Sequence, residues 1–347
     1  MAKVLKYAIG LDIAKDKFDA CLAVIDDTQK VTIKSSRSSV LNNAKGFQHL
    51  VTWVAKYLDK SIPVVFCMEA TGIYYEHLAW FLYQKGYSVS VLVPRKAKYY
   101  IRSMGIKSKD DKSDAKGLAM MAAQQTLKAW KPLSNQLYPL RQLTRFYQQL
   151  QDSRTLFRNQ RQALLMGRLE NDEITGGLNE LIQLTEEKIK EIQLAIQKAL
   201  QKDPLLWKKV QDINTVKGLG LISIATVIAE TDGFALFENQ AQLVCYCGYD
   251  VIRNQSGKRQ GKTKISKMGN SHIRRILFMP AFNVVKYNIN PFASLYDRVH
   301  ARTMIKMKGY VAVQRKLLVL IYTLWKKNES YSPKMLPEKE TRLSSFC

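Results

Sequence analysis

The sequence predicts an α/β domain followed by two helical regions, and changes of pattern along the chain indicate this division. From residue 7 to about 93, short β-branched runs alternate with amphipathic stretches, which is typical of a mixed sheet with helices packed on it. Residues 137–203 are instead rich in Gln and Leu with charges on one face, which favours long helices. We therefore expect an α/β domain at 1–130, a coiled-coil or helical hairpin at 131–206, a mainly α-helical domain at 207–330 and a flexible tail at 331–347.

The elements of the first domain follow from hydrophobic periodicity. Residues 7–12 and 17–25 have the pattern of paired strands, with a third strand at 30–34. Helices and buried strands then alternate, with helices expected at 42–58 and 74–84 and strands at 63–68 and 87–93.

A seven-residue repeat of apolar residues marks the middle region. Its first run consists of Leu143, Leu150, Phe157 and Leu164, and its second of Ile182, Ile189 and Ile196, with Leu178 and Ile192 between them. Two long helices joined at Gly176 and Gly177 are the simplest prediction. Because Arg154 and Arg161 interrupt the first run, both a hairpin packed on its own chain and a dimerisation element stay open.

The third region begins near Trp207. Residues 216–220 and the apolar run 222–228 fit the turn and second helix of a helix-hairpin-helix, whose glycine amides approach phosphate, and they fit equally a tight turn between core helices. Further helices are expected at 240–246, 271–287 and 310–327.

Charge narrows the class of partner. The chain has 54 Lys and Arg against 29 Asp and Glu, a net charge of +25, which attracts nucleic acid or an anionic membrane. No apolar run approaches the roughly 18 residues that span a bilayer, so a membrane is not expected. The start of the chain lacks a signal-peptide cleavage site, and the five cysteines are an odd number, so we expect a cytoplasmic protein with reduced thiols and no zinc at Cys245 and Cys247.

Four acidic residues stand at strand ends or at a helix start. Asp12 and Glu69 each end a hydrophobic strand, and Asp111 and Asp114 begin a helical stretch, three residues apart on one face. Carboxylates beside a polyphosphate substrate need a divalent cation between the negative partners, so the set predicts a site for one or two Mg²⁺ ions. Taken alone, Asp111 and Asp114 also fit acids that complement a helix dipole.

Three neighbouring acids are assigned to the surface instead: Asp16, Asp19 and Asp110. Asp110 adjoins Asp111 and is able to exchange roles with it.

A basic stretch carries the second candidate site. Residues 251–296 contain nine Lys or Arg and no acidic residue, a composition that neutralises phosphates. Ser256 lies in this stretch, where a hydroxyl either contacts phosphate or attacks a phosphodiester. The expected nucleic-acid contacts are Arg253, Lys258, Arg259, Lys262, Lys264, Lys267, Asn270, Arg274 and Arg275.

Together these motifs resemble the serine-containing DEDD transposases of insertion-sequence family one-ten. The likeness covers nearly the whole chain and rests on the order and spacing of residues 10–13, 68–72, 109–115, 255–257 and 267–270. It implies a RuvC-like RNase H domain, a coiled coil and a C-terminal domain with a nucleophilic serine. One departure is Asp110, where the family usually has Thr or Ser.

The resemblance also implies how the site residues work. Asp12, Glu69, Asp111 and Asp114 correspond to a tetrad that binds Mg²⁺ or Mn²⁺, and Ser256 to the residue that forms a covalent phosphoserine link to DNA. It implies a dimer-based tetramer, in which the acids of one subunit face the serine of another, and a bridge RNA from the element that pairs with donor and target DNA.

We therefore expect an RNA-guided transposase that rejoins DNA strands and associates with the bacterial nucleoid when active. Two alternatives stay open. One is a RuvC-like structure-specific endonuclease in which the acids activate water, and the other is a non-catalytic nucleic-acid-binding protein.

Overall fold

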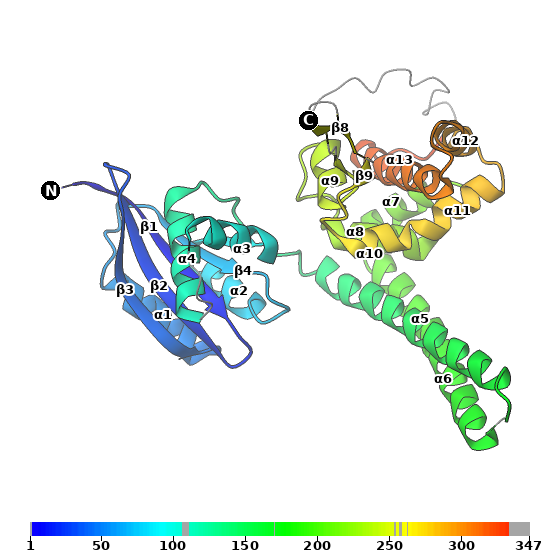
Figure 1. The fold of residues 1–347 in the computed structure, drawn as a ribbon, viewed down its shortest axis with the longest axis horizontal. Helices are drawn as coiled ribbons and strands as arrows, with labels where there is room; N and C mark the ends of the chain where they lie inside the picture. The colour runs from blue at the N-terminus through cyan, green and yellow to red at the C-terminus, as the bar shows by residue number, and fades with distance from the viewer. Residues whose placement is uncertain are drawn as a thin grey trace. The chain divides into compact units, whose positions relative to one another are not determined.

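The computed structural model describes residues 2–105, 111–169, 171–252, 255–256, 259–261 and 263–332, with the backbone alone at 111–112 and 259–260. The chain divides into two compact units, Met1–Pro132 and Leu133–Cys347 (Figure 1). None of the helices in the described ranges is long and apolar enough to cross a membrane.

The first unit is built on a five-stranded sheet in the order β3-β2-β1-β4-β5. The strands are β1 Val4–Ile13, β2 Lys17–Asp26, β3 Val31–Leu41, β4 Val64–Glu69 and β5 Ser88–Leu92. The first three form an antiparallel meander, whereas β4 lies parallel to β1 and β5 lies parallel to β4. This is an RNase H-like mixed sheet, so the predicted fold class is confirmed for the first unit.

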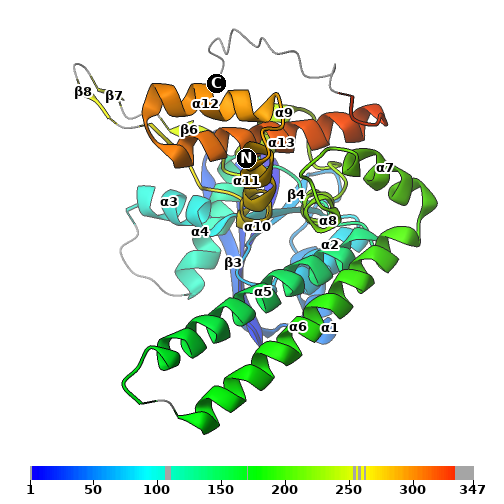
Figure 2. The same ribbon diagram turned by 90° about the vertical axis from the view of Figure 1, so that its right-hand side faces the viewer.

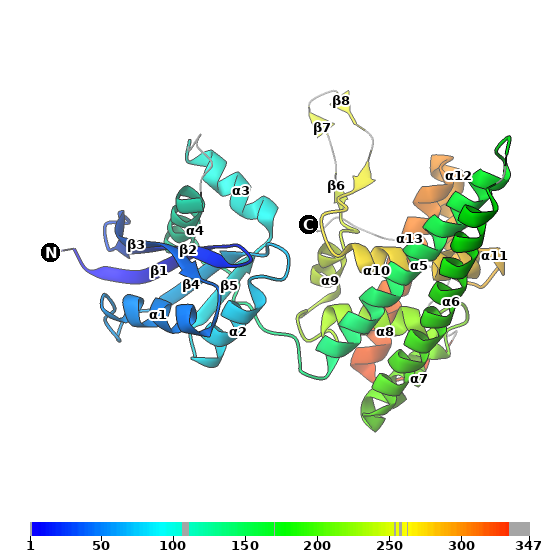
Figure 3. The same cartoon turned by 90° about the horizontal axis from the view of Figure 1, so that it is seen from below.

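Helices cover both faces of the sheet. Figure 3 shows α1 (Ala44–Ala55) and α2 (Glu76–Gln84) on one face, and α3 (Pro94–Ser103) and α4 (Asp111–Gln124) on the other. Strand alternation assigns large residues such as Ile9 and Phe66 to the α1 and α2 core. The opposite face carries small residues such as Ala8 and Cys67, which pack under α3 and α4.

The small residues allow α4 to rest directly on the sheet. A Cβ atom at Gly10 would lie 2.1 Å from the Ala115 carbonyl oxygen and 2.2 Å from the Ala119 backbone nitrogen. Only glycine fits there, because both neighbours are backbone atoms that no side-chain movement displaces. Gly10 therefore holds α4 against the carboxyl-terminal half of β1.

The strand and helix predictions for this unit hold with two differences. β3 extends to Leu41, well past the expected end at residue 34, because its later part is a largely exposed, serine-rich edge without the apolar pattern used to find strands. Helix α3 was not predicted at all, since its sequence is strongly basic and has few apolar residues to indicate a buried face.

The second unit contains the long helical hairpin, α5 (Leu137–Leu165) beside α6 (Asp172–Gln201), seen in Figure 2. The predicted joint at Gly176 and Gly177 is wrong, since both glycines lie inside α6. The helix begins earlier because the Asn171 side chain caps the Ile174 amide at 3.1 Å and acids fill the first turn. A 30-residue helix tolerates the cost of two exposed glycines, about 1 kcal/mol each.

The base of the hairpin belongs to the main core of this unit, as Leu140 and Ile196 pack in one cluster with α8 and α13. The remaining helices are α7 Pro204–Asn214, α8 Leu221–Thr231, α9 Gln240–Tyr246, α10 Ser271–Ile276, α11 Phe278–Lys286, α12 Phe292–Thr303 and α13 Lys306–Lys327. The mainly helical character predicted for the region after the sheet is thereby confirmed.

Four details of these helices differ from the sequence prediction, and one of them is α7, for which no helix was predicted. The helix expected at 271–287 is two helices that meet at Leu277, because Pro280 fits the first turn of α11 and cannot donate within a continuous helix. α12 was not predicted, and α13 begins at Lys306 rather than at residue 310.

The glycine turn between α7 and α8 is packed into the core. Gly218 has φ +90°, and a Cβ there would lie 2.6 Å from Val284 of α11. The positive φ and the close packing explain why a glycine is needed in this tight turn between core helices. Phosphate binding by the turn stays a prediction.

Candidate active site: the carboxylate edge and the serine arm

Asp12 and Glu69 lie at the ends of adjacent parallel strands. Leu11 of β1 pairs with Met68 of β4, so the next residue of each strand is one of the two acids. By strand alternation Asp12 shares its face with Gly10, and Glu69 shares its face with Cys67, the side covered by α3 and α4. Both carboxylates are half-buried, and the Thr71 hydroxyl donates to Glu69 Oε1 at 3.4 Å.

Asp114 comes to the same region through α4. It is half-buried and directly precedes Ala115, whose carbonyl rests on Gly10. We call Asp12, Glu69 and Asp114 the carboxylate edge. Asp111 is the first residue of α4, but its side chain lies outside the described part of the chain, as does Asp110 entirely.

The carboxylate edge has the donor chemistry of a Mg²⁺ site, since all its donors are carboxylate oxygens. In the described residues, however, no three His, Cys, Asp or Glu side chains are arranged as a group that could hold a metal ion. The fourth predicted ligand, Asp111, is not covered by that search. The carboxylate chemistry and the strand register are those expected of a divalent-ion site, but the described side chains do not by themselves form one, and the assignment of the four ligands stays a prediction.

Asp19 corrects a prediction. It was assigned to the surface, but it is only 7% exposed and pairs with Asp12 across the β1–β2 hairpin. Its Oδ1 accepts a hydrogen bond from the Ser39 amide at 2.7 Å. The hairpin register carried the signal, because a turn at residues 14–16 places residue 19 opposite residue 12. Asp16 is exposed, as predicted.

Ser256 lies on a β-ribbon that stands out from the helices of the second unit (Figure 3). We call residues 251–265 the serine arm. Its lower ladder pairs β6 (Val251–Ile252) with β9 (Lys264–Ile265), and its upper ladder pairs β7 (Gln255–Ser256) with β8 (Arg259–Gln260). Ser256 is exposed and opposite Arg259. Arg253, Lys258 and Lys262 lie outside the described residues, and Arg259 is described by its backbone only.

Hydrogen bonds and close backbone packing fix the base of the arm. The Ser266 amide donates to the Asp250 carbonyl at 2.8 Å, and the Ser266 hydroxyl donates to Asp250 Oδ1 at 2.5 Å. A Cβ at Gly269 would lie 2.2 Å from the Tyr246 carbonyl oxygen, so this position needs glycine. The two ends of the arm are therefore held against α9.

Several predicted nucleic-acid contacts also have partners inside the chain. The Arg274 guanidinium donates to the Cys247 carbonyl at 2.8 Å, and Arg275 forms an ion pair with Asp152 of α5. Asn270 caps α10 by accepting from the Ile273 amide at 3.1 Å. These side chains support the base of the arm, whereas Lys264 and Lys267 are exposed, and nucleic-acid binding by any of them stays a prediction.

Asn270 also joins a buried ion pair that sequence reasoning missed. Glu230 is 2% exposed and accepts from Arg145 Nε at 2.6 Å, Arg145 Nη2 at 2.9 Å and Asn270 Nδ2 at 2.7 Å. Burial raises the pKa of Glu230, but the hydrogen bonds and charge of Arg145, with Asn270, outweigh it and leave the pKa below its ordinary value. An acid in the otherwise apolar run of α8 was the available signal, because a buried carboxylate requires a partner.

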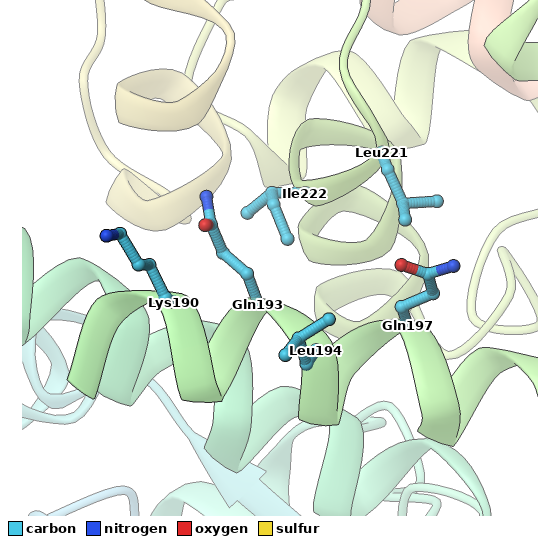
Figure 4. A pocket seen from close by; sticks show the side chains of 6 residues that line it. All are labelled: Lys190, Gln193, Leu194, Gln197, Leu221 and Ile222. Carbon is cyan, nitrogen blue, oxygen red and sulfur yellow. The ribbon is translucent and has the colours of Figure 1, made fainter. Parts of the chain in front are cut away.

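The pocket between α6 and the start of α8 is a poor candidate for the chemistry (Figure 4). It is open and mainly apolar, and Lys190 is the only charged residue among the six that line it. None of the six side chains carries a carboxylate, a hydroxyl or a thiol.

An RNase H-like sheet with carboxylates at the ends of its central parallel strands defines a class of enzymes that act on nucleic acid with divalent metal ions. A DEDD transposase model of the IS110 family matches residues 9–170, and a model described as the transposase IS116/IS110/IS902 family matches residues 210–297. Together the models span both units. The chain belongs to the IS110 family of DEDD transposases, whose members catalyse DNA cleavage and rejoining, and this family implies use of a divalent metal.

Curated relatives agree with this placement over most of their length. The pilin gene-inverting protein of Moraxella bovis is 27% identical over 335 residues, covering 95% of this chain and 99% of the relative. The transposase for insertion sequence element IS1111A of Coxiella burnetii is 22% identical, covering 93% of this chain and 90% of the relative. A probable family 20 transposase of Pseudomonas aeruginosa is 23% identical, covering 80% and 84%.

Proposed function

We propose that the protein is a divalent-metal-dependent recombinase that moves or inverts its own DNA element, with Ser256 as the nucleophile. The observation that carries this proposal is the position of Ser256, which is exposed on the serine arm. The surrounding residues 251–296 include nine Lys or Arg and no acidic residue. Cations around a hydroxyl favour its ionised form and stabilise the charge of a phosphoryl transition state. The family match supplies the DNA substrate.

In the proposed reaction, Ser256 Oγ attacks a DNA phosphorus atom. The P–Oγ bond forms, the P–O bond to one deoxyribose breaks, the serine proton leaves and the departing oxygen gains a proton. The phosphoserine link conserves the bond energy, so attack by a DNA hydroxyl on that link rejoins strands without ATP. Asp12, Glu69, Asp111 and Asp114 would hold Mg²⁺ or Mn²⁺, which when bound stabilises negative charge at the reacting phosphate.

The resemblance supports two further parts of the proposal. One is a bridge RNA from the element that pairs with donor and target DNA. The other is a dimer-based tetramer in which the acids of one subunit serve the serine of another. The helical hairpin of α5 and α6 is a long surface for such assembly, and Leu181, Leu184 and Leu194 of α6 are exposed on it.

A denaturing gel tests the serine and the acids together. Labelled junction DNA is incubated with protein, element-derived RNA and Mg²⁺, comparing wild type with Ser256→Ala and Asp12→Ala. Loss of a nucleophile or a metal ligand is expected to lower the yield of covalent protein–DNA adduct by about 1,000-fold or more. Thr263→Ala is the matched control, because it removes another exposed hydroxyl of the serine arm and is expected to leave the adduct intact.

Cleavage without adduct, unchanged in Ser256→Ala, would instead indicate an endonuclease that uses water. DNA binding that survives EDTA, with no strand broken under any condition, would indicate a non-catalytic binding protein.

A further inference from the structure

Helix α3 presents a basic surface that the candidate site does not explain. Its ten residues include four basic side chains and no acidic one, namely Arg95, Lys96, Lys98 and Arg102. All four are exposed, whereas Ala97 is completely buried and Ile101 half-buried. The helix thus carries its charge on the side that faces solvent in the first unit.

The charged residues form a continuous stripe along the helix. Arg95, Tyr99 and Arg102 recur at four- and three-residue intervals, so they share one face, and Lys98 lies beside them. Arg95 Nε donates to the Tyr99 hydroxyl at 2.8 Å, and its guanidinium lies 5.2 Å from the ring centre. The stripe spans about 10 Å, at 1.5 Å rise per residue.

The opposite side of α3 is occupied. Ile101 packs so closely on α4 that a Cβ at Gly117 would lie 2.5 Å from Ile101 Cγ1. A basic amphipathic helix on a membrane needs a free apolar face to insert. Since Ala97 and Ile101 face the core of the first unit, the stripe fits a polyanion rather than a lipid surface.

The start of α3 lies at the carboxylate edge. Glu69 pairs with Leu92 at the end of β5, the Ala70 amide donates to the Leu92 carbonyl at 2.9 Å, and α3 begins at Pro94.

Charge balance gives a reason for a basic helix beside the carboxylate edge. The carboxylate edge repels DNA phosphates wherever metal ions do not neutralise it, so a strand needs cations on the protein to hold it beside the edge. We propose that the exposed face of α3 binds the phosphate backbone of the DNA strand that the enzyme cuts, next to the carboxylate edge. This inference rests on the proposed function only in that the carboxylate edge acts on DNA.

Salt-dependent binding tests the surface directly. The double variant Lys98→Gln with Arg102→Gln removes two cations and keeps helix-forming side chains. Binding of labelled duplex DNA to the full chain is measured across a series of salt concentrations, with Ser256→Ala present in every protein. The slope of log affinity against log salt is expected to become shallower by about 2, because each lost phosphate contact removes about 0.9.

Lys56→Gln with Lys60→Gln is the matched control. These exposed lysines precede β4 and therefore lie toward the opposite edge of the sheet, where they are expected to leave the slope unchanged. An unchanged DNA slope in the α3 variant with a wild-type circular dichroism spectrum would overturn the proposal. So would a change seen with element-derived RNA but not with DNA.

The result is independent of the serine assignment, because binding is measured without Ser256. If wild type forms no adduct while the α3 slope falls as expected, the serine mechanism fails and the α3 surface stands. If the adduct forms and the slope of the α3 variant is unchanged, the serine mechanism stands and the α3 surface is wrong.

Discussion

The carboxylate edge and the serine arm are held in opposite ways. The carboxylate edge lies on strands of a five-stranded sheet, and the backbone of α4 contacts Gly10 directly. In its described residues, the serine arm has two short ladders of two residues per strand, and Ser256 is exposed on the upper one. Metal ligands need placement within about 0.5 Å, which packed elements provide. In the proposed function, the nucleophile therefore lies on the less tightly packed of the two elements.

The two regions also depend on different interactions for their stability. In the first unit, small residues on one sheet face set the distance of α4. In the second unit, a polar network of Glu230, Arg145 and Asn270 supports the base of the arm, while the side chains of the arm that the structure describes are exposed or half-buried. Substitutions in the two regions should therefore fail in different ways.

Among substitutions outside the proposed catalytic residues, the largest effect is expected from Gly10→Ala. The added Cβ would meet backbone atoms of α4 at 2.1 and 2.2 Å, so α4 must move away from β1 and take Asp111 and Asp114 with it. Overpacking of this kind costs about 1 to 3 kcal/mol or more, and a 1 Å misplacement of catalytic groups costs about 100-fold in rate. Adduct yield on labelled junction DNA is expected to fall at least 100-fold.

Hydrogen exchange locates the Gly10→Ala damage. Amides of β1 and α4 should exchange faster while those of α8 and α13 keep their wild-type rates, because the two units have separate cores. Full activity in Gly10→Ala would contradict the fixed position of α4 over the sheet.

Arg145→Met is expected to have the next largest effect, and to destabilise the second unit alone. It leaves Glu230 buried without its cation, which costs about 3 kcal/mol, the lower end for a broken buried pair because Arg145 is 39% exposed. Thermal or urea unfolding at neutral pH measures the loss. Arg158→Met on the same helix is the control, since its pair with Glu186 is exposed on both sides and should cost less than about 1 kcal/mol.

The pH dependence of this substitution has a definite sign. Burial raises the pKa of Glu230, and in wild type Arg145 and Asn270 lower it below the ordinary value, so its stabilising contribution is complete above about pH 4.3 and is lost as pH falls through the folded-state pKa. In Arg145→Met burial dominates and the carboxyl takes up a proton more readily. The deficit in unfolding free energy should therefore be largest at neutral pH and narrow toward pH 4; a constant deficit would contradict the charge argument.

Patterned segments of the fold were predictable from sequence, and context-dependent ones were not. The strands β1, β2, β4 and β5 follow apolar runs, and the seven-residue repeat predicts both long helices. The joint at Gly176 and Gly177 was wrong because the cap at Asn171 outweighs glycine propensity. Propensity is a weak guide where a strong cap and tertiary packing act together.

The candidate site shows the same limit. Asp12 and Glu69 were predictable because strand-end acids after apolar runs are visible in sequence, and the structure sets them side by side. Asp19 and Glu230 were not identified, since their burial depends on hairpin register and on a partner 85 residues away. The α3 surface was missed because its proposed role depends on the position of the helix beside the carboxylate edge, which the sequence does not show.

A smaller effect is expected from loosening the base of the serine arm. Asp250→Ala removes the hydrogen bond from the Ser266 hydroxyl, worth about 1 kcal/mol, and should lower adduct yield several-fold while leaving the first unit unchanged. Ser266→Ala removes the same bond and also the acceptor of the Met268 amide at 3.2 Å, so its loss should be equal or larger. The double variant should lose less than the sum of the two, because the Asp250–Ser266 bond is counted in both. Additive losses would show that the two side chains act separately.

The smallest effect, and the only gain, is expected from Gly177→Ala. Unlike Gly10, Gly177 lies in the interior of α6, and a Cβ there meets no atom within 4 Å. Alanine removes backbone freedom from the unfolded chain without a clash, so the unfolding free energy should rise by about 0.5 to 1 kcal/mol, measured by urea unfolding. Gly176→Ala, which is equally open, should give a similar gain. A loss in both variants would mean that α6 bends or breaks at this pair in solution, as the sequence alone suggested. A higher unfolding free energy in both variants, together with the loss of activity expected for Gly10→Ala, would show that the hairpin does not need its two glycines. The carboxylate edge, in contrast, needs Gly10.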